Sequence, residues 1–134
     1  MKIITLSAAL ILTFICAHSQ NLIGYKEKEI RKYMKDYRSE MNFNPVTNDK
    51  FSYLKYSDNS ENQTLLFFLN TDSVCNSVRI ICSLNMKAEK VKELNSKYIK
   101  SGENRWVDKH DGKDYLIEIM YGKWSCVITI EQGK

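Results

Sequence analysis

The segment Asp72-Ser-Val-Cys-Asn-Ser-Val-Arg-Ile-Ile-Cys-Ser-Leu84 carries the strand pattern on which the predicted fold rests. Successive side chains of a β-strand point to opposite faces of the sheet, so residues two apart share a face. One face is formed by Val78, Ile80, Cys82 and Leu84, and the other by Ser77, Arg79, Ile81 and Ser83. Because the first set is apolar and the second mostly polar, the segment predicts a half-buried antiparallel strand.

Further strands are predicted on both sides of this segment. The run 64–69 is apolar on both faces, which is typical of a central strand, and the run 51–56 is rich in aromatic residues. A strand is also expected near 105–108. Two longer alternating runs follow, with Tyr115, Ile117, Ile119 and Tyr121 inward in the first and Trp124, Cys126, Ile128 and Ile130 inward in the second. Turn signals such as Asp111-Gly112 and Gly122-Lys123 separate these runs.

Two segments have helical spacing. Apolar residues recur every three or four positions over about 25–41, and again from Asn85 to Ser101-Gly102, where glycine suits a left-handed helix cap. The expected order is therefore helix, three strands, helix and two or three strands. We expect a two-layer α+β domain, with one antiparallel sheet of about five strands and two helices packed on one of its faces.

The N-terminal segment resembles an export signal. A short basic start, Met1-Lys2, precedes an apolar run over 3–15 that is too short to span a bilayer comfortably. Ala17 and Ser19 then place small residues at the −3 and −1 positions of a cleavage site before Gln20. We expect a signal peptide over 1–19, a single domain over 20–134, and a secreted or periplasmic location. Cys16 raises the alternative of a lipoprotein anchor, which the preceding Thr13-Phe14-Ile15 fits poorly.

The three cysteines after the signal allow several interpretations. On one strand, Cys75 and Cys82 would lie about 23 Å apart, too far for a disulfide. Cys82 and Cys126 both occupy inward positions, so a disulfide between them is a candidate if their strands are neighbours. The alternative is buried free cysteine that packs as a small apolar residue. An odd number leaves at least one thiol unbridged within the chain, and Cys75, near a turn, is the candidate free thiol.

Signatures of enzymes are absent from the sequence. The expected mature chain has one histidine, His110, in a predicted turn, and nothing brings it to Cys75 as a thiol-activating base. Neither nucleophile motifs nor phosphate-binding glycine loops occur, and no two metal-ligating residues have the spacing of a structural zinc site. We therefore expect no enzyme activity, no catalytic or metal-binding residues and no cofactor.

The formal net charge is +4, with alternating signs along the chain, which disfavours a nucleic-acid partner. No second apolar segment of membrane-spanning length follows the signal, so we expect no transmembrane segment in the mature chain.

The run 64–69 also suggests an interaction face. Leu66 and Phe68 point away from the side shared by Leu65, Phe67 and Leu69, so either this chain or a partner must cover them. We expect a non-enzymatic module that binds an unknown protein, or associates with itself, through its sheet. The alternative is a small carrier that holds an apolar ligand between sheet and helices.

Three pieces of sequence resemble a known group of proteins. They are the cleavage region before Gln20, Gly24-Tyr-Lys-Glu-Lys-Glu-Ile30, and Leu94-Asn-Ser-Lys-Tyr98 followed by Trp106 and Tyr115-Leu-Ile-Glu-Ile119. Together they resemble small exported proteins of Bacteroidota, a resemblance that implies location and no particular activity. The element order is also similar to type III secretion chaperone and YbjN-like folds, which is an analogy of order alone.

Overall fold

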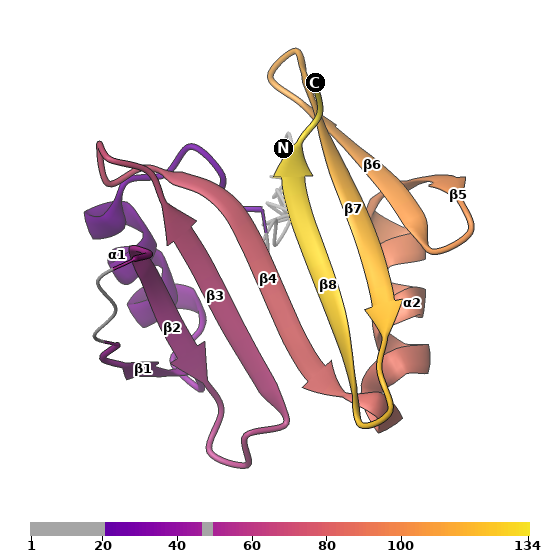
Figure 1. Ribbon diagram of the computed structural model, residues 1–134, viewed down its shortest axis with the longest axis horizontal. Helices are drawn as coiled ribbons and strands as arrows, with labels where there is room; N and C mark the ends of the chain where they lie inside the picture. The colour runs from indigo at the N-terminus through magenta and orange to yellow at the C-terminus, as the bar shows by residue number, and fades with distance from the viewer. Residues whose placement is uncertain (1–20, 47–49) are drawn as a thin grey trace, which may run out of the picture.

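The structure is a computed structural model that describes residues 21–46 and 50–134 (Figure 1). The predicted signal peptide and Cys16 lie outside the described residues, so the predicted export stays a prediction.

The described residues form one antiparallel sheet of eight strands in the order β1-β2-β3-β4-β8-β7-β6-β5. The strands are β1 (Asn42–Asn44), β2 (Tyr53–Ser57), β3 (Gln63–Leu69), β4 (Cys75–Ser83), β5 (Ile99–Gly102), β6 (Arg105–His110), β7 (Lys113–Tyr121) and β8 (Ser125–Gln132). The prediction of about five strands is therefore wrong. The four strands β1 to β4 follow one another directly, and β8 returns from the far side to pair with β4.

The two edge strands, β1 and β5, account for most of the difference between the five or so predicted strands and the eight in the structure. β1 has three residues, two of them asparagine, and lies directly before Pro45, so its sequence is typical of a turn. β5 follows the second helix directly and was predicted as that helix's last turn. Instead Ile99 pairs with Val107 and Lys100 with Trp106, so ladder hydrogen bonds to β6 replace the helical ones. Tertiary pairing here overrides the helical spacing.

Two α-helices accompany the sheet. They are α1 (Glu27–Tyr37) and α2 (Lys87–Lys97), the second preceded by the short 3-10 helix η1 (Leu84–Met86). Both are shorter than predicted. α1 ends where Arg38 leaves helical geometry, and Met41 is buried in the turn before β1 instead of on the helix. Among the described residues, no helix is long and apolar enough to cross a membrane.

Both helices lie behind the same face of the sheet, α1 behind β2 and β3 and α2 behind β6 and β7 (Figure 1). This inner face and the helices share one hydrophobic core, to which α1 contributes Ile30 and Met34 and α2 contributes Leu94. The inward strand residues of this core are Leu54, Tyr56, Leu65, Phe67, Cys75, Val78, Ile80, Cys82, Trp106, Tyr115, Ile117, Ile119, Cys126, Ile128 and Ile130. Neither of the helices in the described part of the chain lies on the opposite face of the sheet.

Trp106 attaches α2 to the sheet. Its side chain is 1% exposed, and its indole Nε1 donates a hydrogen bond of 2.9 Å to the side-chain oxygen of Asn95 on α2. The indole therefore both fills the core and satisfies its own polar group, which a buried tryptophan requires. The chain's other tryptophan, Trp124, was predicted to point inward on the last strand, and this is wrong: it lies in the turn before β8 and is 79% exposed.

The two tryptophans make a matched pair for a stability test. We expect Trp106→Ala to lower the free energy of unfolding by about 3–5 kcal/mol, because it removes a large buried side chain and leaves a cavity. Trp124→Ala should change it by less than about 0.5 kcal/mol, as surface substitutions do. Urea denaturation followed by circular dichroism measures both, and equal losses would contradict the assignment of Trp106 to the core.

Candidate functional site

The sheet face that points away from the two described helices is called the outer face below (Figure 1). Its side chains follow three rows of register partners that cross the sheet. The upper row is Tyr53, Phe68, Ser77, Glu131, Leu116 and Val107; the middle row is Lys55, Leu66, Arg79, Thr129, Glu118 and Arg105; the lower row is Thr64, Ile81, Val127 and Met120. β5 extends the upper row by Ile99.

Leu66 and Phe68, the residues predicted to form an interaction face, lie on the outer face and are half-buried. Their burial comes from neighbours within that face. The ring of Phe68 lies 5.6 Å from the ring of Tyr53, centre to centre. The guanidinium carbon of Arg79 lies 5.4 Å from the centre of the same ring, within the range of a cation–π interaction. No helix of residues 21–46 and 50–134 covers the pair.

The other half of the outer face carries more exposed apolar side chains. Leu116 is 51% exposed and Met120 is 61% exposed, both on β7. Val127 and Val107 beside them are partly exposed. Of the residues predicted to point inward on this strand, Tyr115, Ile117 and Ile119 are buried and Tyr121 is 37% exposed, while the outward residues were not singled out. The signal was present, because Leu116, Glu118 and Met120 alternate with the inward tyrosine and isoleucines.

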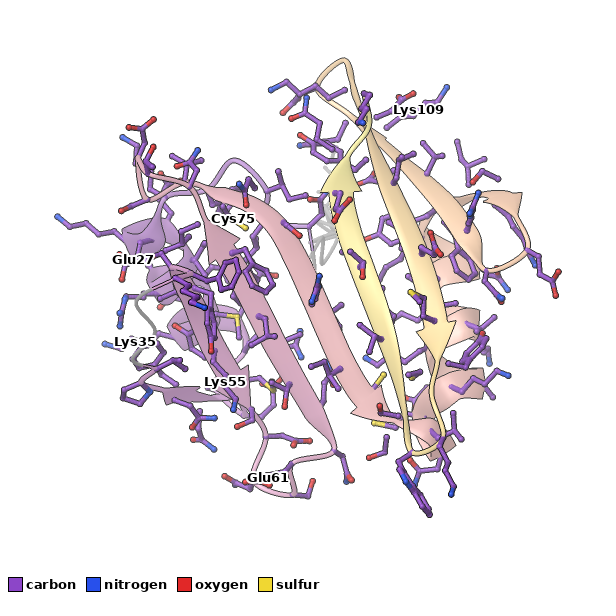
Figure 2. The ribbon with its side chains drawn as sticks, viewed as in Figure 1. Glu27, Lys35, Lys55, Glu61, Cys75 and Lys109 are labelled. Atoms are coloured by element: carbon purple, nitrogen blue, oxygen red, sulfur yellow. The ribbon has the colours of Figure 1, made fainter. Side chains whose placement is uncertain are left out.

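Charge divides the outer face into two halves. The outward positions of β2, β3 and β4 include the cations Lys55 and Arg79 and no acidic residue in the described rows (Figure 2 labels Lys55). The outward positions of β8 and β7 carry Glu131 and Glu118. Beyond them, Arg105 on β6 lies 3.7 Å from Glu118, as a largely exposed ion pair. One half is thus basic, and the adjoining half is acidic toward the sheet centre.

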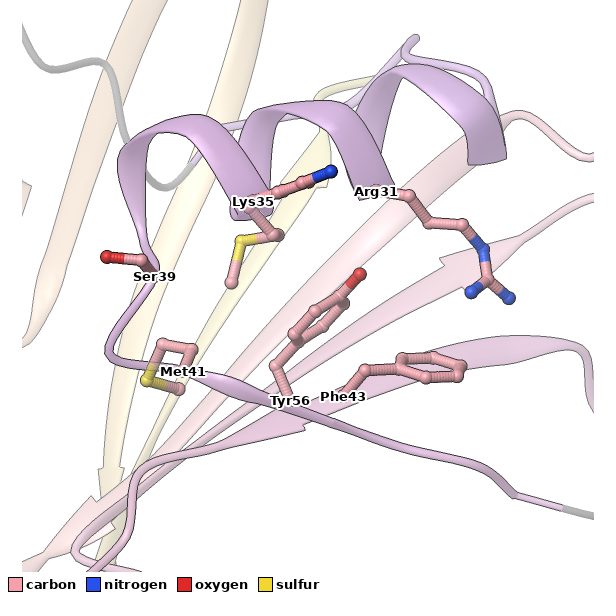
Figure 3. A pocket seen from close by; sticks show the side chains of 7 residues that line it. Arg31, Lys35, Ser39, Met41, Phe43 and Tyr56 are labelled. Atoms are coloured by element: carbon pink, nitrogen blue, oxygen red, sulfur yellow. The ribbon is translucent and has the colours of Figure 1, made fainter.

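A second surface feature is a cleft between α1 and the β1–β2 edge of the sheet, with a volume of ≈ 360 Å³. Met34, Met41 and Tyr56 form its apolar floor, and Arg31 and Lys35 stand at its rim. Figure 3 shows the Tyr56 ring rising from the sheet toward α1, between Met41 and Arg31. The guanidinium carbon of Arg31 lies 4.3 Å from the centre of the Phe43 ring, while its Nη2 contacts Glu27 at 3.0 Å.

Cys82 and Cys126 are brought together in the core. They are register partners on β4 and β8, and their sulfur atoms lie 2.8 Å apart. Directly opposed residues of an antiparallel pair have Cα atoms about 4.5–5.5 Å apart, which a disulfide can span. Burial, followed by the hydrogen bond with the Cys126 thiol, raises the pKa of Cys82 to about 12. The two thiols are free in this structure, and the bridge stays a prediction.

Cys75 lies at the start of β4, near the upper end of the sheet (Figure 2), and it too is buried and free. A register shift next to Leu69 turns its side chain inward, onto the same face as Cys82. Its sulfur donates to the carbonyl oxygen of Ser77 at 3.4 Å. Burial raises its pKa to about 11, so the thiol stays protonated at neutral pH and is a weak nucleophile.

His110, the other residue considered for chemistry, ends β6. Its Nε2 lies 3.2 Å from a carboxylate oxygen of Asp111 in the adjoining turn, and both side chains are largely exposed. Cys75 begins β4 and His110 ends β6, and the strands β8 and β7 lie between these two strands in the sheet. Across residues 21–46 and 50–134, no cluster of histidine, cysteine and carboxylate side chains has the geometry of a metal site.

Comparisons of the chain with protein-family models, with curated proteins and with solved structures found no match. The resemblance to small exported proteins of Bacteroidota and the analogy with secretion chaperone folds therefore stay predictions.

The cysteine geometry makes a prediction about oxidation. When the unfolded chain is refolded with oxidised glutathione, we expect one internal disulfide, Cys82–Cys126, formed as glutathione is reduced. Cys75 should remain a thiol, because neither Cys82 nor Cys126 is its register partner. Peptide mass mapping after alkylation without reductant measures the linkage. A bridge to Cys75, or three alkylated cysteines, would contradict the prediction, and Cys126→Ala should abolish the internal bridge.

Proposed function

We propose that this protein is a non-enzymatic, secreted or envelope-associated module that binds another protein through the outer face of its sheet. The observation that carries the proposal is the apolar character of the sheet face opposite the two described helices. Leu116 and Met120 expose more than half of their surface there, beside the half-buried Leu66 and Phe68. Extended apolar patches of this kind, interspersed with charges, mark protein interaction sites.

The shape and chemistry of the face favour a protein partner over a small molecule. The three rows extend over six adjacent strands, whereas small ligands are held in enclosed, concave sites. The rows alternate apolar side chains with charged ones such as Arg79 and Glu118, and protein interfaces likewise combine an apolar centre with charged and polar groups. Burial raises the pKa of Cys75 to about 11, so this thiol is protonated at neutral pH, which supports the non-enzymatic part of the proposal.

Site-specific photocrosslinking in cells tests this proposal. We expect Leu116→benzoylphenylalanine and Met120→benzoylphenylalanine to give the same discrete protein adduct, because both positions lie within the proposed interface. Tyr37→benzoylphenylalanine is the matched control, since Tyr37 is 63% exposed on α1, behind the sheet. Adding Arg79→Glu should weaken the adduct about tenfold, as loss of an interface arginine does. Adducts at all three positions alike, or at none, would contradict the proposal.

A second candidate function is a carrier of an amphipathic acidic ligand, and the cleft beneath α1 is the observation that favours it. Its apolar floor would hold a hydrocarbon portion, and the cations at its rim would face a carboxylate. The volume of ≈ 360 Å³ lies at the lower end for ligand sites, so the outer face remains the better-supported site.

Native mass spectrometry of the purified protein tests the carrier function. A bound fatty acid or related anion should appear as an added mass, and Arg31→Ala should reduce its occupancy about tenfold by removing the rim charge. Lys32→Ala, which removes a neighbouring cation that does not line the cleft, should leave the occupancy unchanged. A protein without added mass, including after incubation with oleate, would exclude this function.

A further inference from the structure

The most exposed large apolar side chain of the described residues lies at the end of a hairpin. Trp124 is 79% exposed, more than any other large apolar residue in 21–46 and 50–134. It lies in the short turn between β7 and β8, at the lower end of the sheet in Figure 1. A hydrogen bond of 2.8 Å from the backbone N–H of Gly122 to the carbonyl oxygen of Ser125 closes this turn. A single exposed apolar residue is ordinary on a protein surface, so the neighbours of Trp124 decide what it indicates.

Two further apolar side chains are exposed beside Trp124. Tyr121 ends β7, directly before the turn, and Leu84 begins the 3-10 helix η1. Their exposed fractions are 37% and 36%. The backbone N–H of Leu84 donates a hydrogen bond of 3.3 Å to the carbonyl oxygen of Trp124, which joins η1 to the turn. Two segments that are distant in the sequence thus form one exposed patch.

Two lysines belong to the same patch, and each lies over an aromatic ring. The Nζ of Lys123 lies 5.3 Å from the centre of the Trp124 ring. The Nζ of Lys87, the first residue of α2, lies 3.8 Å from the centre of the Tyr121 ring. Both distances are within the range of a cation–π interaction. The patch is called the hairpin tip below, and its residues are Leu84, Lys87, Tyr121, Lys123 and Trp124.

We propose that the hairpin tip inserts into the interfacial layer of an anionic phospholipid membrane. This goes beyond the proposed function, because the tip lies at the end of the sheet and outside the rows of the outer face. Tryptophan and tyrosine are favoured at the membrane–water interface, since each combines an apolar ring with a polar group. Lysine side chains can rest their carbon chains on apolar surface and keep their ammonium groups at the level of the lipid phosphates.

The charge of the tip favours an anionic lipid over a neutral one. The segments 83–88 and 120–125, which contain the tip, carry two lysines and no acidic residue. Each lysine close to an anionic lipid surface strengthens binding about fivefold. The lipid surface therefore supplies the negative charge that these segments lack.

The size of the tip favours a membrane over a protein partner. Specific protein interfaces contain about 20–30 residues on each side, whereas the tip offers five side chains. Binding to a lipid surface scales with the apolar area that is buried plus the attraction between charges, so a small patch binds weakly and reversibly. Small molecules are held in concave sites, which the end of a hairpin does not provide.

The other side of the same sheet end predicts how the chain approaches the membrane. Glu61 lies in the β2–β3 turn, at the lower left in Figure 2 and apart from the β7–β8 turn. An anionic surface repels its carboxylate. The sheet should therefore approach the membrane tilted, with the β7–β8 turn in front and the β2–β3 turn held away.

Fluorescence quenching by brominated lipids tests the proposal. The chain has two tryptophans, and Trp106 is buried in the core, so bromine in the acyl chains reaches only Trp124. Vesicles of brominated phosphatidylglycerol and phosphatidylethanolamine in equal parts should quench the Trp124 emission, and vesicles of brominated phosphatidylcholine should not. Trp124→Ala should abolish the quenching. The signal reports on the tip itself, whether or not residues 1–19 are still attached.

Charge reversal tests the part that the lysines play. Lys87→Glu and Lys123→Glu should each lower the ratio of inserted to free tip at least about fivefold. Lys109→Glu is the matched control, because it makes the same change of charge at the opposite, upper end of the sheet (Figure 2) and should leave the quenching unchanged. Circular dichroism should show all three variants folded, since the three lysines are exposed.

Four results would overturn the proposal. They are no quenching by the anionic vesicles, equal quenching by phosphatidylcholine, quenching that persists in Trp124→Ala, and a loss in Lys109→Glu as large as in Lys123→Glu. Because the tip lies outside the rows of the outer face, any of these results leaves the proposed function as it stands. Loss of the protein adduct at Leu116 and Met120, with quenching intact, would contradict the proposed function alone.

Discussion

The pairing of β4 with β8 is the interaction on which the rest of the structure depends. It joins seven register pairs, from Ser77–Glu131 to Ser83–Ser125, at the centre of the sheet. Without it, the chain would consist of two four-stranded halves, each with its own helix, an unpaired edge and half of a core. Val78, Ile80, Ile128 and Ile130 are fully buried at this seam, so the pairing closes the hydrophobic core as well as the hydrogen-bond ladder.

The register of this pair also determines both faces at once. A slip of one residue would turn Arg79 and Thr129 into the core and the isoleucines outward, which burial of one face strongly disfavours. The same alternation that aligns Cys82 with Cys126 inside therefore places Arg79 beside Thr129 outside. The same register therefore determines which residues fill the core and which lie on the outer face. A change of register in either strand would alter both faces.

The central strands could be predicted from the sequence because burial of one sheet face makes apolar and polar residues alternate along a strand. Val78, Ile80 and Cys82 alternate with polar neighbours, and Leu66 and Phe68 lie in a run too apolar to be explained by one face. The edge strands could not be predicted, because β1 and β5 bury little of their own surface and depend on a neighbouring strand. Asn42–Asn44 has no apolar pattern, and Ile99 fits the spacing of the preceding helix.

The candidate site was predictable only in part, for a related reason. A sequence shows which residues share a face of one strand, but it does not give the order of strands in the sheet. The separation of Lys55 and Arg79 from Glu118 and Glu131 exists only once β8 is placed between β4 and β7. Cys82 and Cys126 are neighbours because β4 pairs with β8. The sequence does not show that pairing, so a disulfide and two free thiols were both possible interpretations.

The position of β8 has a consequence for the order of events during synthesis. It is the last strand along the chain and yet lies in the middle of the sheet, flanked by β4 and β7. While residues 125–132 are still inside the ribosome, both of these neighbours have an open edge and half of the inner face has no counterpart. The core cannot be completed before β8 emerges, because β8 joins the two halves of the sheet. Its pairing with β4 connects residues more than forty positions apart, and contacts of such large sequence separation slow folding.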